Sequence, residues 1–518
     1  MALRDVRGAR SRRAPLGRAG VVALAAALYL GAGAASTWPA LEESRSSFLA
    51  EGGPGEGEAV SGDHLQALYQ LWLPGHQLER GEAPWRDPYS FAGSVEPRLS
   101  FAGWPFGLVL WPLHRLLGSV GAWNAFVLLS YAGSGLLVFL WLESLGVGRP
   151  AALAGGLVFA LAPYRAAQLS AGHLLAPVSM LLPLALWALE RRRTLVAVAA
   201  LASIPLSGQV HLALGAIPFF VLYAACRQRL VPGALAGLGA VATGLLVYWT
   251  AIRGTVGEGG RSFAQVERYS AELVDLVSRD IRDGLEAFAL LGWLTPAVAL
   301  VGLALLAARR SRLALALGLG AAIPIVLALG ANTPAYEPLW RYLPGLHETR
   351  VPERLLPIAA LCLAGLAAFA LERVRHAAVT AFAVIALGLD LRLGVDLFRP
   401  TAADEANAAY AALRAQPSGR VLELPPYLPD DQRGSSYLYY VLQAPRERLL
   451  GYSTVAPPAA DGLARSLARS PCAGAAGLGV RYVVVHPPLT RAVCPGAREI
   501  ARDGPVLLLE LASNGDEP

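Results

Sequence analysis

The chain has 518 residues, of which 55% are hydrophobic and only 16% charged, and its mean hydropathy is +0.45. This composition excludes an ordinary soluble protein of this size and is typical of a polytopic membrane protein. All 44 basic residues are arginine, which excludes lysine chemistry such as a Schiff base. The net charge of +6 does not indicate nucleic-acid binding, because the arginines lie in short clusters between apolar runs.

A basic segment, residues 1–18, precedes an apolar run from Ala19 to Trp38. The run is long for a signal peptide, although GAGAAS, at Gly31–Ser36, has the small residues of a cleavage site. We interpret residues 1–18 as cytoplasmic and the run as the first transmembrane helix.

Further apolar runs are long enough to cross a bilayer, which takes about 17 to 25 residues. These runs lie at 121–142, 174–190, 209–225, 231–250, 286–308, 313–330, 355–371 and 377–395, with shorter ones at 150–164 and 193–207. The sequence therefore predicts about eleven transmembrane helices within residues 19–398.

Arginine clusters fall in every second loop between these runs. They are Arg191, Arg192 and Arg193, then Arg227 and Arg229, then Arg309, Arg310 and Arg312, then Arg373 and Arg375. Cytoplasmic loops carry the excess of positive charge, so these loops are predicted inside with the N-terminus. An odd number of spans then places the C-terminal region outside, together with the connections 39–120, 251–285 and 331–354. The chemistry is expected in these outer segments.

The region 399–518 differs in pattern from the rest. Residues Ala402–Ala415 are predicted to be helical, and VLELP, RYVVVH and PVLLLEL are predicted strands. This alternation predicts a small extracytoplasmic α/β domain. Cys472 and Cys494 both lie in it, and the sequence is equally compatible with a disulfide and with two unpaired thiols.

The outer segments differ in charge. Acidic residues Asp63, Asp87 and Glu96 lie in the first one. The later ones hold Arg253, Arg261, Arg268, Arg341, His347, Arg350 and Arg354. This division suits sugar transfer from a lipid-linked phosphate: a carboxylate takes the proton of an acceptor hydroxyl, and guanidinium groups hold the departing phosphate.

Local patterns make this reaction more specific. The segments GDHLQALYQLW, HQLERGEAPWRDPYSF and SFAGWPFGLVLWPL resemble the first extracytoplasmic loop of GT-C membrane glycosyltransferases, which use polyprenyl-phosphate or polyprenyl-diphosphate sugars. Bacterial members, including YfhO-like groups, are similar to LAPYRAAQLSAGHLLAPVSMLLPLALWAL, YEPLWRYLPGLHETRVPERLLPIAALCLAG, VLELP and LYYVLQAPRERLLGYSTVAPP. The resemblance covers most of the chain. It implies an all-α polytopic membrane domain at 19–398 and a C-terminal α/β domain at 399–518.

The resemblance also implies roles for single residues. Asp63 matches the catalytic aspartate of the family, and Arg350 and Arg354 in HETRVPER are expected to face the donor phosphate. His173, in SAGHLL at an outer helix end, and His347 are expected to bind substrate. The acidic pair of metal-dependent members is absent, so no cofactor is predicted with certainty, a divalent cation is doubtful, and HExxH and CxxC motifs are lacking.

Together these features predict inverting transfer of a sugar from a polyprenyl-phosphate donor to an envelope glycan, lipid or protein. The expected site is the extracytoplasmic face of a bacterial inner membrane. Two alternatives are an inactive scaffold of the same fold and a transporter or flippase for a lipid-linked substrate. The centres of the predicted spans contain almost no charge, which counts against an ion-coupled transporter.

The candidate residues also have structural explanations. Asp63 with Gln66 fits a capping box at a helix N-terminus, in which each side chain bonds the backbone of the other residue. Asp87 and Glu96 each precede a proline and fit turns. Arg350 and Arg354 fit arginines that reach toward lipid headgroups.

Two further patterns have two interpretations each. Aromatic residues of the first outer segment fit membrane-surface anchors better than sugar platforms; they are Trp85, Tyr89, Trp104 and Trp111. Residues 269–281 fit either a short interfacial helix over the site or a solvated connector.

Overall fold

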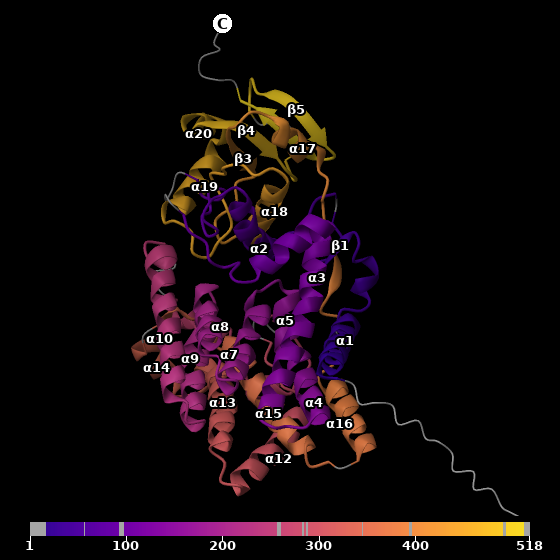
Figure 1. The fold of residues 1–518 in the computed structure, drawn as a ribbon. Coiled ribbons are helices and arrows are strands. Elements are labelled where there is room, and N and C mark those ends of the chain that lie inside the picture. Colours follow the sequence, from indigo (N-terminus) through magenta and orange to yellow (C-terminus); the bar gives the residue numbers. More distant parts are fainter. Residues whose placement is uncertain are drawn as a thin grey trace, which may run out of the picture.

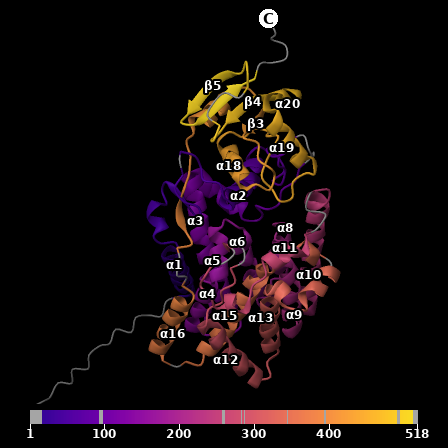
Figure 2. The same ribbon diagram turned by 180° about the vertical axis from the view of Figure 1, so that it is seen from behind.

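The computed structural model describes residues 17–55, 57–92, 98–255, 261–281, 284–285, 288–343, 345–374, 376–392, 396–489 and 494–511. A large helical part carries a smaller part with strands at one end, above helix α2 (Figure 1). The reverse view shows the same arrangement (Figure 2). Residues 1–16, which hold most of the basic N-terminus, and Glu96 and Arg375 lie outside the described residues.

Each predicted apolar run contains a helix. The helices are α1 (Arg18–Ser36), α3 (Gly107–Ser144), α4 (Arg149–Ala160), α5 (Pro163–Ser170), α6 (Leu175–Ser179), α7 (Leu181–Glu190), α8 (Thr194–Leu206), α9 (Val210–Cys226), α10 (Leu230–Val247), α12 (Leu294–Ala308), α13 (Arg312–Ala328), α15 (Leu356–Leu371) and α16 (Ala377–Asp390). The predicted helical class of residues 19–398 therefore agrees with the structure.

Helix length does not settle the number of spans. Four helical segments among the described residues are long and apolar enough to cross a bilayer: Arg18–Ser36, Gly107–Ser144, Leu230–Ile252 and Pro352–Leu371. The other apolar helices have 10 to 17 residues. At 1.5 Å per residue these are shorter than a hydrocarbon core of about 30 Å, so eleven spans stay a prediction.

Helix α15 lies at the centre of the helical part. All its residues except Phe369 are buried, and it packs against α4, α12 and α13. The contact with α12 is close, because a Cβ on Gly302 would lie 1.9 Å from the carbonyl oxygen of Leu366. Since small residues let helix backbones approach each other, this contact fixes α12 against α15.

Two helix boundaries differ from the predicted ones. Helix α3 begins at Gly107, within the outer segment predicted to extend to residue 120. It is interrupted at Gly118, whose φ of 73° is a conformation that glycine adopts readily and other residues rarely adopt. The apolar sequence continues on both sides of this residue. Helix α12 begins only at Leu294, after Gly292 with a φ of 79°, instead of at the predicted residue 286.

The C-terminal region contains all three predicted strands. Its elements are β2 (Arg399–Ala402), α17 (Ala408–Ala415), β3 (Arg420–Leu424), α18 (Ser435–Gln443), α19 (Ala459–Arg469), α20 (Pro471–Gly477), β4 (Val480–Val485), β5 (Arg498–Asp503) and β6 (Val506–Glu510). The four-stranded sheet has the order β3-β4-β6-β5, with β3 and β4 parallel. A disulfide joins Cys472 and Cys494.

The C-terminal region shares structure with the first outer segment. Strand β1 (Ser47–Ala50) pairs antiparallel with β2, so that Ser47 lies opposite Ala402. Helix α18 packs on α2 (Asp63–Glu79), and the two helices share a cluster of buried aromatic and aliphatic side chains. The cluster comprises Tyr69, Trp72, Leu73, Tyr89, Leu438, Val441 and Tyr452. Residues from opposite ends of the chain thus form one core next to the start of α2.

Candidate active site

Asp63 is the first residue of α2, and its side chain does not cap the helix. Gly62 occupies the N-cap position, and its backbone N–H donates to Ser435 Oγ at 3.0 Å. Gln66 Nε2 donates to the carbonyl of Tyr452 at 2.9 Å instead of returning to the start of the helix. The predicted capping box does not form, because the Asp63 carboxylate and the Gln66 amide bond other partners.

The carboxylate of Asp63 accepts hydrogen bonds from three distant side chains. His173 Nε2 donates to Oδ2 at 2.8 Å. Tyr452 Oη donates to Oδ1 at 2.6 Å, and Gln432 Nε2 donates to the same oxygen at 3.2 Å. The side chain of Asp63 is 20% exposed. It is thus held in place and still reaches the surface.

These contacts set the charge of Asp63. Burial by itself raises the pKa of the carboxyl, but hydrogen bonds from His173, Tyr452 and Gln432, together with the positive charge of His173, lower that pKa well below its usual range. Asp63 is consequently an anion throughout the physiological pH range.

Hydrogen bonds hold both ring nitrogens of His173. Its Nδ1 lies 2.7 Å from Oε1 of Gln168, whose Nε2 donates to the carbonyl of Leu285 at 3.1 Å. That second bond fixes the orientation of the Gln168 amide, and Nε2 of His173 faces the Asp63 carboxylate. His173, expected to bind substrate, is a partner of Asp63.

A glycine allows His173 to approach. Gly172, in the turn between α5 and α6, has a φ of +87°, and a Cβ there would lie 2.1 Å from the backbone nitrogen of His64. Only glycine fits this contact between two backbones. The turn after α5 therefore presses against the first turn of α2.

The second group of candidates consists of arginines. Burial, with the positive charges of Arg350 and Arg354, lowers the pKa of Arg261, while Glu348 and Asp430 act in the opposite direction. Arg350 and Arg354 are therefore close enough to Arg261 to act on its charge. The Arg350 guanidinium also lies 5.6 Å from the centre of the Tyr269 ring.

His347 takes part in this group only through its backbone. Its carbonyl accepts from the Arg261 N–H at 3.1 Å, whereas its exposed side chain lies 3.1 Å from the Glu348 carboxylate. Among the described residues, the hydrogen bonds of Asp63 lead to His173, Gln432 and Tyr452 and not to an arginine. No hydrogen bond between described residues therefore joins the carboxylate of Asp63 directly to the arginine candidates.

The other acidic candidate is buried. Asp87 accepts from Tyr69 Oη at 2.5 Å, from the Tyr89 backbone N–H at 3.0 Å and from Ser90 Oγ at 2.7 Å. The bond to Tyr89, two residues on, is that of the predicted turn. The remaining partners show that Asp87 also organises the interior of the outer segment.

Two other predictions concern segments near the site. Within residues 269–281 the structure has a short 3-10 helix, Leu273–Leu276, whose Leu273 side chain is exposed. Among the aromatic candidates, Tyr89 is buried, and Trp104 Nε1 donates to Ser203 Oγ at 3.3 Å.

The residues around Asp63 do not fit a divalent cation. Both carboxylate oxygens face hydrogen-bond partners, one of them the imidazole of His173, whereas a hard cation needs several oxygen ligands. No group of three or more His, Cys, Asp or Glu side chains in the described part of the chain is placed to hold a metal ion.

Comparisons with known proteins find no matching family model and no matching curated protein. Solved structures, however, are similar. Arabinofuranosyltransferase AftD from Mycobacteria matches 97% of this chain with a TM-score of 0.58 and 18% identity, and this chain spans 40% of AftD. ArnT from Cupriavidus metallidurans bound to undecaprenyl phosphate matches 97% of this chain and 100% of its own, with a TM-score of 0.48 and 16% identity.

The archaeal oligosaccharyltransferase AglB from Archaeoglobus fulgidus, in complex with an inhibitory peptide and a dolichol-phosphate, matches 90% of this chain and 69% of its own. Its TM-score is 0.48 at 14% identity. The likeness to AftD shows that this chain shares the fold of that structure. The YfhO-like grouping stays a prediction.

Proposed function

We propose that the chain is a membrane glycosyltransferase that transfers a sugar from a polyprenyl-phosphate donor to an acceptor hydroxyl. One observation carries the proposal: Asp63 is an oriented, partly exposed carboxylate where the first outer segment, the helical part and the C-terminal region meet. The fold shared with the arabinofuranosyltransferase AftD supports it. The expected location is the extracytoplasmic face of a bacterial inner membrane, with the N-terminus in the cytoplasm.

In this reaction Asp63 is the base. The acceptor oxygen forms a bond to the anomeric carbon from the face opposite the phosphate, its proton passes to Asp63, and the carbon–oxygen bond to the phosphate breaks. Configuration at the carbon is inverted. Because its pKa is low, Asp63 takes the proton late, when the oxygen has already become acidic through bonding to carbon. His173 and Tyr452 hold the carboxylate in the required orientation.

Arg261, Arg350 and Arg354 are proposed to hold the departing phosphate. Three guanidinium groups repel one another where they are partly buried, as the lowered pKa of Arg261 indicates. A phosphate placed among them removes this repulsion and accepts charge-assisted hydrogen bonds. His347 is a weaker candidate, since its side chain already pairs with Glu348.

The second candidate function is an inactive scaffold of the same fold. One observation favours it: three donors within the chain already engage both oxygens of Asp63. A structural ion pair would have the same geometry. Transport of a lipid-linked substrate stays an alternative that the measurement below also addresses.

The first test compares the purified full-length chain in lipid nanodiscs with Asp63→Asn. Synthetic polyprenyl-phosphate arabinofuranose, mannose and galactose serve as donors, an extract of bacterial envelope glycans, lipids and proteins supplies the acceptor hydroxyls, and the release of polyprenyl phosphate is measured. The asparagine keeps the shape but cannot accept the proton, so we expect turnover to fall about 10²- to 10⁴-fold. Equal turnover by both proteins would exclude Asp63 as base. Absence of release by the wild type with all three donors would favour the scaffold or transport.

The second test concerns the arginines. Arg261→Gln and Arg350→Gln should each weaken donor turnover about tenfold or more, because a charge-assisted contact to phosphate is lost. Arg341→Gln is the matched control, since Arg341 is exposed and pairs with Glu337 on its own helix, α14 (Tyr336–Tyr342). If all three variants behave alike, the proposed phosphate site is wrong.

A further inference from the structure

Two of the three donors to Asp63 come from the C-terminal region. Tyr452 and Gln432 lie 389 and 369 positions further along the chain, and both bond Oδ1. Gln432 begins the short 3-10 helix Gln432–Gly434, and Tyr452 lies in the segment between α18 and α19. Among the described residues of the helical part, His173 supplies a partner for Oδ2 and none bonds Oδ1.

Tyr452 is fixed to α2 by its backbone as well as by its side chain. Its carbonyl accepts from Gln66, one turn after Asp63, while its hydroxyl donates to Asp63. Its ring is 8% exposed and packs in the shared cluster described above, with Tyr69 and Trp72 among its members. A backbone hydrogen bond, a side-chain hydrogen bond and ring packing thus orient the Tyr452 hydroxyl, and all three contacts are made with residues of α2.

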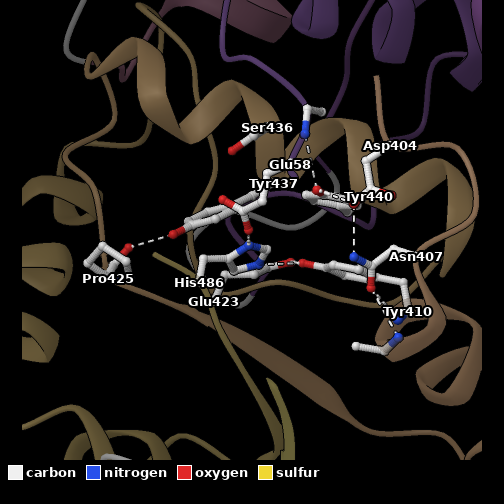
Figure 3. A network of polar contacts seen from close by, with 12 residues as sticks. Glu58, Asp404, Asn407, Tyr410, Glu423, Pro425, Ser436, Tyr437, Tyr440 and His486 are labelled. Carbon is white, nitrogen blue, oxygen red and sulfur yellow. Dashed lines mark hydrogen bonds and ion pairs between the residues drawn. The ribbon is translucent and has the colours of Figure 1, made fainter. Parts of the chain in front are cut away.

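The chain just before Asp63 is also bound to the C-terminal region. The Glu58 carboxylate lies 2.5 Å from Nδ1 of His486, and the Ala59 N–H donates to Tyr440 Oη at 3.4 Å. Figure 3 shows this network, in which His486 Nε2 bonds Tyr410 Oη at 2.9 Å and the rings of Tyr410 and Tyr440 stack. The C-terminal region therefore holds the segment on both sides of Asp63.

We infer that Tyr452 and Gln432 are positioning residues for Asp63, so that the catalytic site is built jointly by the first outer segment and the C-terminal region. The inference rests on the proposed function, in which Asp63 is the base. It assigns to the C-terminal region a part in the chemistry and not only in the fold.

The inference has a measurable consequence for the ionisation of Asp63. The titratable groups that act on Asp63 are His173, Tyr452 and, next to it in α2, His64. The Tyr452 hydroxyl stabilises the carboxylate, and burial opposes it. Without the hydroxyl, the pKa of Asp63 rises, so the base is protonated at higher pH.

The test is the pH dependence of donor turnover by the full-length chain in nanodiscs. Tyr452→Phe should move the acid limb of the profile to higher pH by about one unit, and Gln432→Ala by less, as expected for loss of one hydrogen bond to a charged group. Tyr437→Phe is the control: it removes an equally buried hydroxyl from α18, which donates to the Pro425 carbonyl and not to Asp63. A purely structural role would lower turnover at every pH and leave the limb in place, and that result would overturn the inference.

A measurement without catalysis separates this inference from the proposed function. The low pKa of folded Asp63 stabilises the fold above the pKa of the unfolded carboxyl, and this stability is lost as pH falls. The drop in melting temperature between about pH 5 and about pH 2, where the folded carboxyl itself begins to bind a proton, should therefore differ between Tyr452→Phe and the wild type, but not between Tyr437→Phe and the wild type. If the wild type releases no polyprenyl phosphate while this difference is present, the proposed function fails and the positioning contact stands. If no difference is present, the contact itself is refuted.

Discussion

Asp63 and His64 are neighbours in the chain, yet they lie in opposite surroundings. Asp63 reaches the surface among three donors, whereas His64 is 2% exposed and packs against the rings of Phe48 and Trp123. Burial lowers the pKa of His64 to about 3, although the charge of Asp63 acts in the other direction. His64 is therefore neutral at physiological pH.

The buried His64 predicts acid sensitivity of the fold. Its pKa of about 3 lies below the ordinary value of 6.5, so the unfolded chain binds the proton more tightly. Stability is complete above about pH 6.5 and falls as pH decreases toward 3, by about 2 kcal/mol at pH 5. His64→Phe should lose less stability than the wild type between pH 7.5 and pH 5 in thermal unfolding. His347→Gln, a change at an exposed histidine, should behave like the wild type.

Asp87 provides a residue-level comparison with Asp63. Because it is buried and accepts from Tyr69, Tyr89 and Ser90, Asp87→Asn should destabilise the fold by about 2 to 4 kcal/mol. Turnover per folded molecule should remain close to that of the wild type. The check is unfolding together with donor turnover, and a catalytic loss as large as that of Asp63→Asn would mean that Asp87 takes part in the reaction.

Only part of the site could be predicted from the sequence. Asp63 was identified through resemblance, whereas the spacing of Asp63 and Gln66 favoured a helix cap that does not form, since Gln66 bonds the Tyr452 carbonyl instead. Tyr452 and Gln432 lack any local signal, since their role arises from contacts almost 400 positions away. Arg350 and Arg354 were named together, and the structure adds Arg261 to them.

At the scale of elements, the site depends on the contact between the turn after α5 and the first turn of α2. Gly172 permits this contact through its positive φ and its missing side chain. The contact brings His173 to Asp63. The hydrogen bond between His173 and Asp63 therefore requires a glycine at position 172.

Gly172→Ala should therefore destabilise the protein by about 2 kcal/mol or more and reduce donor turnover, because the added carbon displaces His173 from Asp63. Gly81→Ala is the matched control at the end of α2. Gly81 also has a positive φ, of 73°, but a Cβ there would meet nothing within 4 Å. The control should lose about 1 kcal/mol and keep its turnover. Thermal unfolding measures the stability of both variants, and donor assays measure their turnover. Equal behaviour of the two variants would show that the contact between Gly172 and the backbone of His64 does not matter for the site.

Apolar runs predicted the existence of the helices but not all their ends. The early start of α3 was missed because the apolar pattern is continuous through Gly118, and only backbone geometry separates the two halves. Strand β5, with the sequence REIARD, was missed because it is an edge strand with mostly polar residues. Strands β3, β4 and β6 were predictable from their buried apolar residues.

At the scale of the whole molecule, the arrangement of parts agrees with an outer location of the C-terminal region. The disulfide between Cys472 and Cys494 is typical of an oxidising compartment. The arginine clusters, which are predicted to be cytoplasmic, include Arg192 between α7 and α8.

Alkaline phosphatase fused after Leu511 should consequently be active in a bacterial host, because this enzyme folds only outside the cytoplasm. The same reporter fused after Arg192 should be inactive. Enzyme activity in cells, normalised to the amount of fusion protein, is the measurement. Activity of the second fusion and not of the first would reverse the predicted topology.

Strand β1 finds its partner β2 only after the whole helical part has been made. The ribosome releases Asp63 early, and Gln432 and Tyr452 follow only after the helical part. Until then the aspartate is without its final environment. A nascent chain that ends before Tyr452 cannot assemble the finished pocket, so maturation of the site waits for translocation of the C-terminal region.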